Sequence, residues 1–296
     1  MKKLFILFLA LTFVLSASLP CSPPVLDFDS PEELHAFFQW TPDRPPVLSA
    51  HRGGPYPGYP ENCIESFENI LSHVPATLET DVRITRDSVL ILMHDRSLER
   101  TSTGRGIVAE TSFKEIKDLH LKDNTGAQTP YRIPSLKEAL IRVKGKSILN
   151  LDIKSGVPFE KVVDLIHETG TEASVIIIVY NIADGIHVNR LDPGLMLSLT
   201  IRNDEELQRA KDAGIPLRRV TAFTGTRLQN RKLYRKLHNE KIFVNCGTLG
   251  NLDRKAMARG DHLYKRWERL GIDIFSTDRP LEAARVLYDI KGENNE

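Results

Sequence analysis

Three acidic residues in two apolar runs have the types and the spacing of a cation site. Glu79 and Asp81 are two positions apart in the run Thr77–Ile84, so in a strand both side chains point to the same face. Asp152 lies in a second run of this kind, Ser147–Ile153. Carboxylates turned into a protein interior are costly unless a positive charge joins them, and their oxygen atoms suit Ca²⁺ or Mg²⁺. We therefore expect Glu79, Asp81 and Asp152 to bind a divalent cation.

Two basic residues near these acids have the chemistry of phosphate ligands. Arg52 offers a planar fork of donors, and Lys154, which shares a strand face with Asp152, offers a compact positive charge. An alternative remains open, because Lys154 could instead neutralise Glu79 or Asp152 in a buried ion network. Taken together, the three acids favour the metal site over that alternative.

Two histidines stand at the ends of apolar runs. His51 ends the run Val47–His51 and precedes Arg52, and His94 ends a later run just before Asp95. Imidazole titrates near neutral pH, so two histidines on either side of a phosphate can act as general base and general acid. The sequence does not indicate which of the two takes which role.

Short apolar runs that alternate with helix-like segments must position these side chains. The alternation indicates βαβ units and a parallel sheet. Eight repeats favour an α/β fold of the closed (β/α)₈ TIM barrel type, with a doubly wound open sheet as the alternative. Strands are expected at Val47–His51, Thr77–Ile84, Ser147–Ile153, Ser174–Tyr180, Leu195–Ile201, Arg219–Phe223, Lys241–Cys246 and Asp273–Ser276. Helices are expected at Glu61–His73, Ser135–Val143, Pro158–Glu168, Ala183–Arg190, Asp204–Ala213, Arg227–Asn239, Arg254–Leu270 and Leu281–Ile290.

Residues 86–131 interrupt this alternation between the second and third strands. They contain a hairpin-like run at Val89–Met93 and a helix-like run at Ser112–Leu119. Barrel active sites are built by the loops that follow the strands, so a long insertion at that end is usually functional. We expect a small inserted subdomain above the barrel mouth.

Composition and charge limit the partners of this protein. Of its 296 residues, 41% are hydrophobic, which is enough for one large core. The charged residues nearly cancel, to a formal net charge of +1. This balance gives no general affinity for nucleic acid or for an anionic membrane. A phosphate-bearing ligand must therefore be held by a local site.

The N-terminal residues have the pattern of an exported protein. Lys2 and Lys3 precede the apolar run Leu4–Val14, which is typical of a secretory signal peptide over residues 1–18. The run is short for a membrane span, which takes about 20 residues, and an uncleaved anchor is the alternative. We expect a periplasmic or secreted protein, with membrane contact only through a lipid anchor on Cys21.

The remaining assignments concern the segment before the barrel and two cysteines. Residues 19–45 are interpreted as an N-terminal tether with one short helix at Pro31–Phe38, and residues 46–296 as the barrel domain. Cys63 and Cys246 are interpreted as two buried thiols, with a disulfide as the alternative.

Five segments of the chain resemble the successive motifs of the glycerophosphodiester phosphodiesterase family. They are AHRGG…YPENCIESFENIL, LETDVRITRDSVLILMHDRSLERTSTGRG, IPSLKEAL, LNLDIK and FSTDRP, in the order of the family, over roughly residues 47–280. The resemblance implies a metal-dependent hydrolase on a TIM barrel with an inserted subdomain. It also implies that Ca²⁺ or Mg²⁺ is the cofactor and that a small glycerophosphodiester is split into an alcohol and glycerol 3-phosphate.

The resemblance further implies a role for each candidate residue. By this resemblance, the acid/base pair of the family would be His51 and His94 in this chain. Its metal ligands would be Glu79, Asp81 and Asp152. The residues that contact phosphate or substrate correspond to Arg52, Lys154 and Glu61, the last of which lies in a Pro-Glu-Asn turn that shapes the loop over the site.

Three departures from the family pattern bear on the pocket. The loop between His51 and Glu61 carries an additional Gly-Pro-Tyr-Pro-Gly-Tyr stretch, which would reshape the glycerol or headgroup pocket. Asp152 stands where glutamate is common, which shortens the reach of this carboxylate by a methylene group. The seventh strand lacks the tryptophan often found there, and Phe243 is the candidate to replace its hydrophobic surface.

Two other functions remain open. A related lipid phosphodiesterase, of the lysophospholipase D or phospholipase C type, would need an apolar lip at the mouth, which the loop with Tyr56 and Tyr59 could provide. A non-catalytic surface binding protein would bind a phosphodiester or a metal without turnover. Because none of the candidate histidines and acids is missing from the set, we favour the enzyme.

Overall fold

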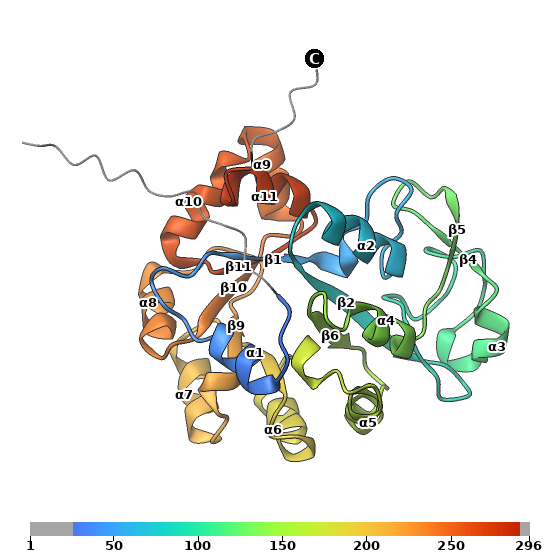
Figure 1. Ribbon diagram of the computed structural model, residues 1–296, viewed down its shortest axis with the longest axis horizontal. Helices are drawn as coiled ribbons and strands as arrows, with labels where there is room; N and C mark the ends of the chain where they lie inside the picture. The colour runs from blue at the N-terminus through green and yellow to red at the C-terminus, as the bar shows by residue number, and fades with distance from the viewer. Residues whose placement is uncertain (1–25, 291–296) are drawn as a thin grey trace, which may run out of the picture.

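Eight parallel strands close into a barrel in the computed structural model, which describes residues 26–290 (Figure 1). The strands are β1 (Val47–Ala50), β2 (Thr77–Ile84), β6 (Leu149–Ile153), β7 (Val175–Val179), β8 (Met196–Thr200), β9 (Val220–Phe223), β10 (Phe243–Gly247) and β11 (Ile274–Thr277). Their hydrogen-bonded order is β1-β11-β10-β9-β8-β7-β6-β2. β2 returns to β1, with Thr77 opposite Ser49 and Leu78 opposite Ala50. The TIM barrel is therefore confirmed, and the open sheet is wrong.

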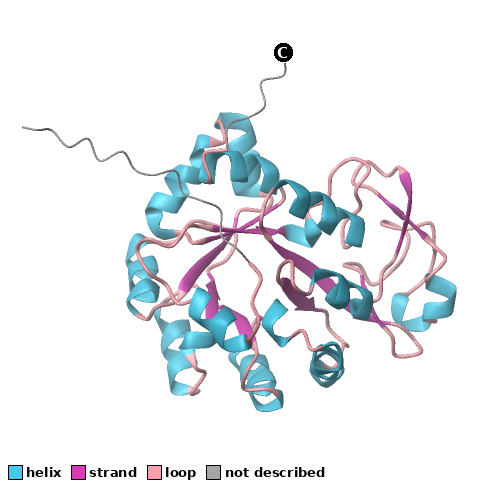
Figure 2. Cartoon of the chain, in the orientation of Figure 1, coloured by secondary structure: helices cyan, strands magenta, loops and turns pink. Residues whose placement is uncertain are grey.

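Helices follow the strands and cover the outside of the barrel (Figure 2). The α-helices of the barrel are α2 (Ile64–His73), α4 (Leu136–Val143), α5 (Phe159–Thr169), α6 (Ile182–Leu191), α7 (Asp204–Asp212), α8 (Arg231–Asn239), α9 (Asn251–Arg259), α10 (His262–Gly271) and α11 (Pro280–Leu287). Short 3₁₀ turns are η1 (His51–Gly53), η2 (Val108–Glu110), η3 (Glu172–Ser174) and η4 (Leu217–Arg219). Over the described residues 26–290, no helix combines the length and the apolar character that a membrane span requires.

Local hydrogen bonds and backbone angles decide where helices begin and end. The side chain of Asn203 accepts the backbone N–H of Glu206, so α7 begins where the sequence predicts. The single helix expected at Arg254–Leu270 is wrong, because the structure has two helices, α9 and α10, in its place. Gly260 ends α9 with φ 104°, a conformation that L side chains rarely adopt.

The insertion at residues 86–131 forms a small packed unit on one side of the barrel, near α2 (Figure 1). Its strand β3 (Leu90–Leu92) pairs antiparallel with β2. Its strands β4 (His120–Lys122) and β5 (Gln128–Arg132) form a separate two-stranded sheet. The helix α3 (Phe113–Ile116) is shorter than the expected run, because the chain soon turns into β4. His94 lies two residues after the end of β3, so the insertion supplies one of the candidate histidines.

The segment before β1 packs against the N-terminal end of the barrel. Its helix α1 (Pro31–Phe37) buries Leu34, and the Phe38 ring that follows lies 5.5 Å from the Phe243 ring. Both side chains belong to an apolar cluster with residues from the starts of the barrel strands. The described part of the expected tether, residues 26–45, is thus held by apolar burial. The expected signal peptide and Cys21 lie outside the described residues.

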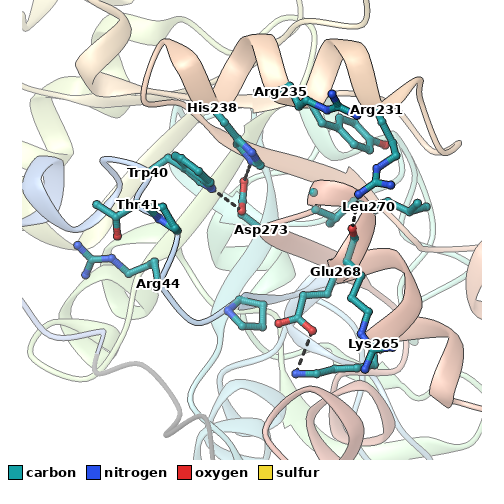
Figure 3. Close-up of a pocket in the computed structure, with 16 residues that line it drawn as sticks. Trp40, Thr41, Arg44, Arg231, Arg235, His238, Lys265, Glu268, Leu270 and Asp273 are labelled. Carbon is teal, nitrogen blue, oxygen red and sulfur yellow. Dashed lines mark hydrogen bonds and ion pairs between the residues drawn. The ribbon is translucent and has the colours of Figure 1, made fainter. Parts of the chain in front are cut away.

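Trp40 fixes this segment to the last barrel strand. Its indole N–H donates to Asp273 Oδ1 at 3.1 Å, and His238 Nε2 lies 2.8 Å from the other oxygen (Figure 3). The Trp40 and His238 rings stack at 4.1 Å. The hollow beside them, about 480 Å³, lies at the N-terminal end of the strands and contains none of the candidate site residues. In barrels that end serves stability, whereas chemistry takes place at the other end.

The burial of Phe38 leads to a stability prediction. Only 1% of its surface is exposed, and truncation of a buried phenylalanine to alanine typically costs about 3–5 kcal/mol. We expect Phe38→Ala to lower the free energy of unfolding by that amount in a denaturant titration. Glu32→Ala, an exposed position in the same helix, is the control. An unchanged midpoint for Phe38→Ala would show that the segment is not part of the folded unit.

Candidate active site

The strands β2 and β6 bring the three acidic residues together. Asp81 lies directly opposite Asp152 in their register. The carboxylates of Glu79, Asp81 and Asp152 are buried, and one oxygen atom of each lies within 4.8 Å of the others. They line one cavity of about 340 Å³. The same cavity is lined by four more candidate residues, His51, Arg52, His94 and Lys154.

This acidic cluster fits a divalent cation. Asp152 Oδ1 is buried and has no hydrogen-bond partner among the described residues, which leaves one oxygen for a ligand. Lys154 Nζ lies 2.5 Å from both Asp81 Oδ1 and Asp152 Oδ2. The ion pair that we considered as an alternative is thus present, but one ammonium balances only one of the three carboxylates. Oxygen donors of this kind can bind a metal of the Ca²⁺ or Mg²⁺ type.

The electrostatics of the cluster show the same excess of negative charge. Burial raises the pKa of Glu79 well above its ordinary value, and the nearby Asp81 carboxylate raises it further. Burial would also raise the pKa of Asp81, but Lys154 and a hydrogen bond from Asn62 Nδ2 at 2.7 Å hold it below its ordinary value. Glu79 is therefore the carboxylate that gains most from an added cation.

The loop after β1 holds Arg52 and Glu79 in place. Arg52 has φ 52°, and its backbone N–H donates to Glu79 Oε2 at 2.7 Å. Gly53 follows with φ 76°, and a Cβ atom there would lie 2.1 Å from the Phe67 ring, so only glycine fits. The Arg52 guanidinium donates to both oxygens of Glu61 at 3.0 Å. Glu61 thus holds Arg52 at the cavity, although Glu61 itself does not line it.

An aspartate from the loop after β11 holds His51. Asp278 Oδ1 lies 2.7 Å from His51 Nδ1, and Asp278 Oδ2 accepts the backbone N–H of Gly250 at 3.0 Å. The other ring nitrogen, Nε2, lies 4.0 Å from Glu79 Oε2. Burial alone would lower the pKa of His51, but the Asp278 hydrogen bond and the charges of Glu79 and Asp278 raise it above the ordinary value. His51 therefore points Nε2 at the acidic cluster.

His94 is held in the same way by its own neighbour. Its Nδ1 lies 2.7 Å from Asp95 Oδ1. Arg100 donates through Nε to Asp95 Oδ2 at 2.5 Å and through both terminal nitrogens to Glu61, at 2.8 and 2.9 Å. The hydrogen bond from Arg100 is the main reason that the pKa of Asp95 lies below its usual range. A chain of charged groups thus connects the insertion to Arg52 through Glu61.

A family comparison covers this whole arrangement. The model described as the glycerophosphoryl diester phosphodiesterase family matches residues 51–281, which include both histidines, the three acids and Asp278. The chain belongs to the glycerophosphoryl diester phosphodiesterase family. The resemblance seen in the sequence motifs is therefore confirmed.

Several members of this family are similar in structure or sequence. A glycerophosphoryl diester phosphodiesterase from Parabacteroides distasonis is 35% identical, with a TM-score of 0.83 over 92% of this chain and 97% of that one. A phosphodiesterase from Oleispira antarctica, solved with the product sn-glycerol-3-phosphate, is 18% identical with a TM-score of 0.64 over 83% of this chain and 97% of that one, a likeness that shows the shared fold. A curated glycerophosphodiester phosphodiesterase from Caldanaerobacter subterraneus is 33% identical over 160 residues. That match spans 52% of this chain and 65% of the relative, slightly less than two thirds of its length.

Four residues of this family member's site were not assigned from the sequence. Asp278 and Asp95 hold the histidines, and Arg100 ties Asp95 to Glu61. Tyr180, at the end of β7, donates its hydroxyl to Asp152 Oδ2 at 2.8 Å. Asp95, Arg100 and Asp278 lie inside the quoted family motifs, so the sequence already indicated that they could belong to the site. Tyr180 had no such indication beyond its place at the end of a strand.

Two expectations about the pocket of this phosphodiesterase family member are wrong. Phe243 does not face the pocket, because it is buried at the N-terminal end of the barrel, and Asn245 lines the cavity from β10 instead. The loop with Tyr56 and Tyr59 does not form a lip on the cavity. The Tyr56 hydroxyl donates to Glu282 Oε2 at 2.9 Å, and the Tyr59 ring stacks on Tyr131 at 6.3 Å.

The cysteine expectation is confirmed, because Cys63 and Cys246 are buried free thiols.

Asp278 leads to a prediction about the orientation of His51. Asp278→Asn removes one of the two carboxylate charges that raise the pKa of His51 and weakens the hydrogen bond that raises it most, so the limb of the pH–rate profile that reports this histidine should move to lower pH. We expect kcat to fall about 10- to 100-fold, as for groups that orient a functional histidine. Asp212→Asn, an exposed position on α7, is the control. An unshifted profile with full activity would rule out this role.

Proposed function

We propose that the protein hydrolyses glycerophosphodiesters to an alcohol and glycerol 3-phosphate with the help of a divalent metal. One observation carries the proposal: two histidines, each held through Nδ1 by an aspartate, line one cavity with three buried carboxylates. Membership of the family supports the substrate class. The product bound to the Oleispira antarctica relative supports glycerol 3-phosphate as the part released.

The cavity offers separate groups for binding and for proton transfer. Arg52 and Lys154 supply positive charge for the phosphate, and Arg52 Nε is buried without a hydrogen-bond partner among the described residues. His51 and His94 can each accept or donate a proton at Nε2, because an aspartate engages Nδ1 in both. One histidine would deprotonate the attacking hydroxyl or water, and the other would protonate the departing alcohol.

Glu79, Asp81 and Asp152 would hold the metal. A bound Ca²⁺ or Mg²⁺ would neutralise phosphate charge and lower the pKa of a coordinated hydroxyl group. Tyr180 and Lys154 both contact Asp152 Oδ2, so they hold this shorter carboxylate with Oδ1 left for the metal.

The test is release of glycerol 3-phosphate from glycerophosphodiesters, with and without added Ca²⁺ or Mg²⁺. Lysophosphatidylcholine serves as the comparison substrate for a lipid phosphodiesterase. We expect turnover of the water-soluble diesters and little of the lysolipid, because the tyrosine loop is engaged elsewhere and does not line the cavity. Binding of a diester without turnover would instead support a non-catalytic binding protein.

We further propose that the protein is exported. The basic, apolar and small residues of positions 1–18 support this, and they lie outside the described structure. The mass of the mature protein would show whether the signal is removed. Comparison of the membrane fraction of the natural protein with that of Cys21→Ala would test a lipid anchor.

A further inference from the structure

A second cavity opens beside the first. It has a volume of about 680 Å³, and it shares His94 and Lys154 with the acidic cavity, so the two are adjacent. Its walls come from the end of β2, from residues 107–109 of the insertion, and from the loop that follows β6 at residues 154–157. A diester whose phosphate lies between the histidines would extend one of its two alcohol groups into this space.

The charged groups of this cavity are all basic. Arg83, Arg96 and Lys154 line it, and no carboxylate does so among the described residues. Arg83 is fixed by donating through Nε and a terminal nitrogen to the His94 carbonyl, at 2.9 and 2.6 Å. Lys154 is paired with the acids of the first cavity. Arg96 is exposed, and its guanidinium has no ion-pair or hydrogen-bond partner in the described structure.

The uncharged part of the wall is aliphatic. Ile84, Ile107 and Val157 contribute to it, and no phenylalanine, tyrosine or tryptophan lines the cavity within residues 26–290. Proteins recognise quaternary ammonium groups with aromatic faces, often aided by carboxylates. This cavity has no Trp, Tyr or Phe face and no carboxylate, so it lacks the groups that would hold choline. Its positive charge would instead attract an alcohol that carries an anionic group.

We propose that this second cavity is the subsite for the departing alcohol and that it favours alcohols with a negative charge. The inference rests on the proposed function, and it adds the substrate class. Arg96 is the specificity-determining residue, because its exposed guanidinium is free to reach a ligand, whereas Arg83 is held by the His94 carbonyl and Lys154 by two carboxylates. Glycerophosphodiesters of anionic alcohols are then better substrates than that of choline.

Three substrates that all release glycerol 3-phosphate test this inference. They are 1,3-bis(glycerophospho)glycerol, glycerophosphoglycerol and glycerophosphocholine, whose departing alcohols are anionic, neutral and cationic. We expect kcat/KM to fall in that order. In Arg96→Glu, the ratio of the anionic to the cationic substrate should fall by about fivefold, the upper end of the range for one exposed ion pair. Arg96→Gln should give an intermediate ratio.

Arg105→Glu is the matched control, since it makes the same charge change on the insertion without lining the cavity. Its ratio should equal that of the natural protein. A natural preference for the choline diester, or an unchanged ratio in both Arg96 variants, would overturn the subsite while leaving the hydrolase activity established. Release of glycerol 3-phosphate from none of the three substrates would instead refute the proposed function, and the subsite with it.

Discussion

Replacement of either His51 or His94 by alanine is expected to lower kcat at least about 10²-fold, the lower end of general acid–base effects. Both rings line the acidic cavity, and each is held through Nδ1 at 2.7 Å from an aspartate oxygen. A ring oriented in this way keeps Nε2 available for a proton in each turnover. Because the two histidines would act in one reaction, the double variant should be only slightly slower than the slower single variant.

The measurement is the rate of glycerol 3-phosphate release under saturating substrate. His73→Ala is the matched control, because His73 is exposed at the end of α2 and away from the cavity. Thermal unfolding of each variant shows whether the fold persists. Activity within tenfold of the natural protein in both folded single variants would remove the acid/base assignment.

The elements that carry the site were predictable because their patterns are local. Side chains in a strand alternate between its two faces, so Glu79 and Asp81, two positions apart, share one face. The structure has this strand, β2, at the predicted residues Thr77–Ile84. The position of His51 at the end of β1 follows from the same reasoning. The cavity that joins these residues to Asp152 then follows from the closure of parallel strands into a barrel.

The partners of the histidines depend on contacts that no local pattern encodes. His51 and Asp278 are 227 positions apart in the sequence, and they meet only because β11 pairs with β1. Arg100 contacts Glu61 across 39 positions. The family motifs contain these residues, but only the folded structure shows that they orient the histidines.

The error at Phe243 has a different cause. Phe243 and Asn245 share one face of β10, so alternation alone cannot separate them. Depth along the barrel axis separates them, because Phe243 packs with Phe38 at the N-terminal end while Asn245 reaches the cavity. Phe243 is the first residue of β10, and the segment that covers this end of the barrel was interpreted from its composition as a tether rather than as part of the core.

Removal of divalent metal should abolish turnover, and this is the other large effect that we expect. Three buried carboxylates lie within 4.8 Å of one another, and Lys154 balances the charge of one. Without a further cation, burial and then repulsion by the Asp81 carboxylate raise the pKa of Glu79. EDTA should therefore reduce glycerol 3-phosphate release to background, and added Ca²⁺ or Mg²⁺ should restore it.

Metal binding should also be visible without substrate. A ligand at 100 times its Kd stabilises a protein by about 2.7 kcal/mol, which corresponds to a rise in Tm of roughly 5–10 °C for a domain of this size. Glu79→Gln and Asp152→Asn keep the shape of the site and remove one charge each, so both should lose most of this rise. Asp164→Asn, exposed on the helix α5 that follows β6, should keep it. Full activity in protein shown to be metal-free by elemental analysis would mean that Lys154 and Arg52 alone balance the phosphate, and the carboxylates would then need a different role.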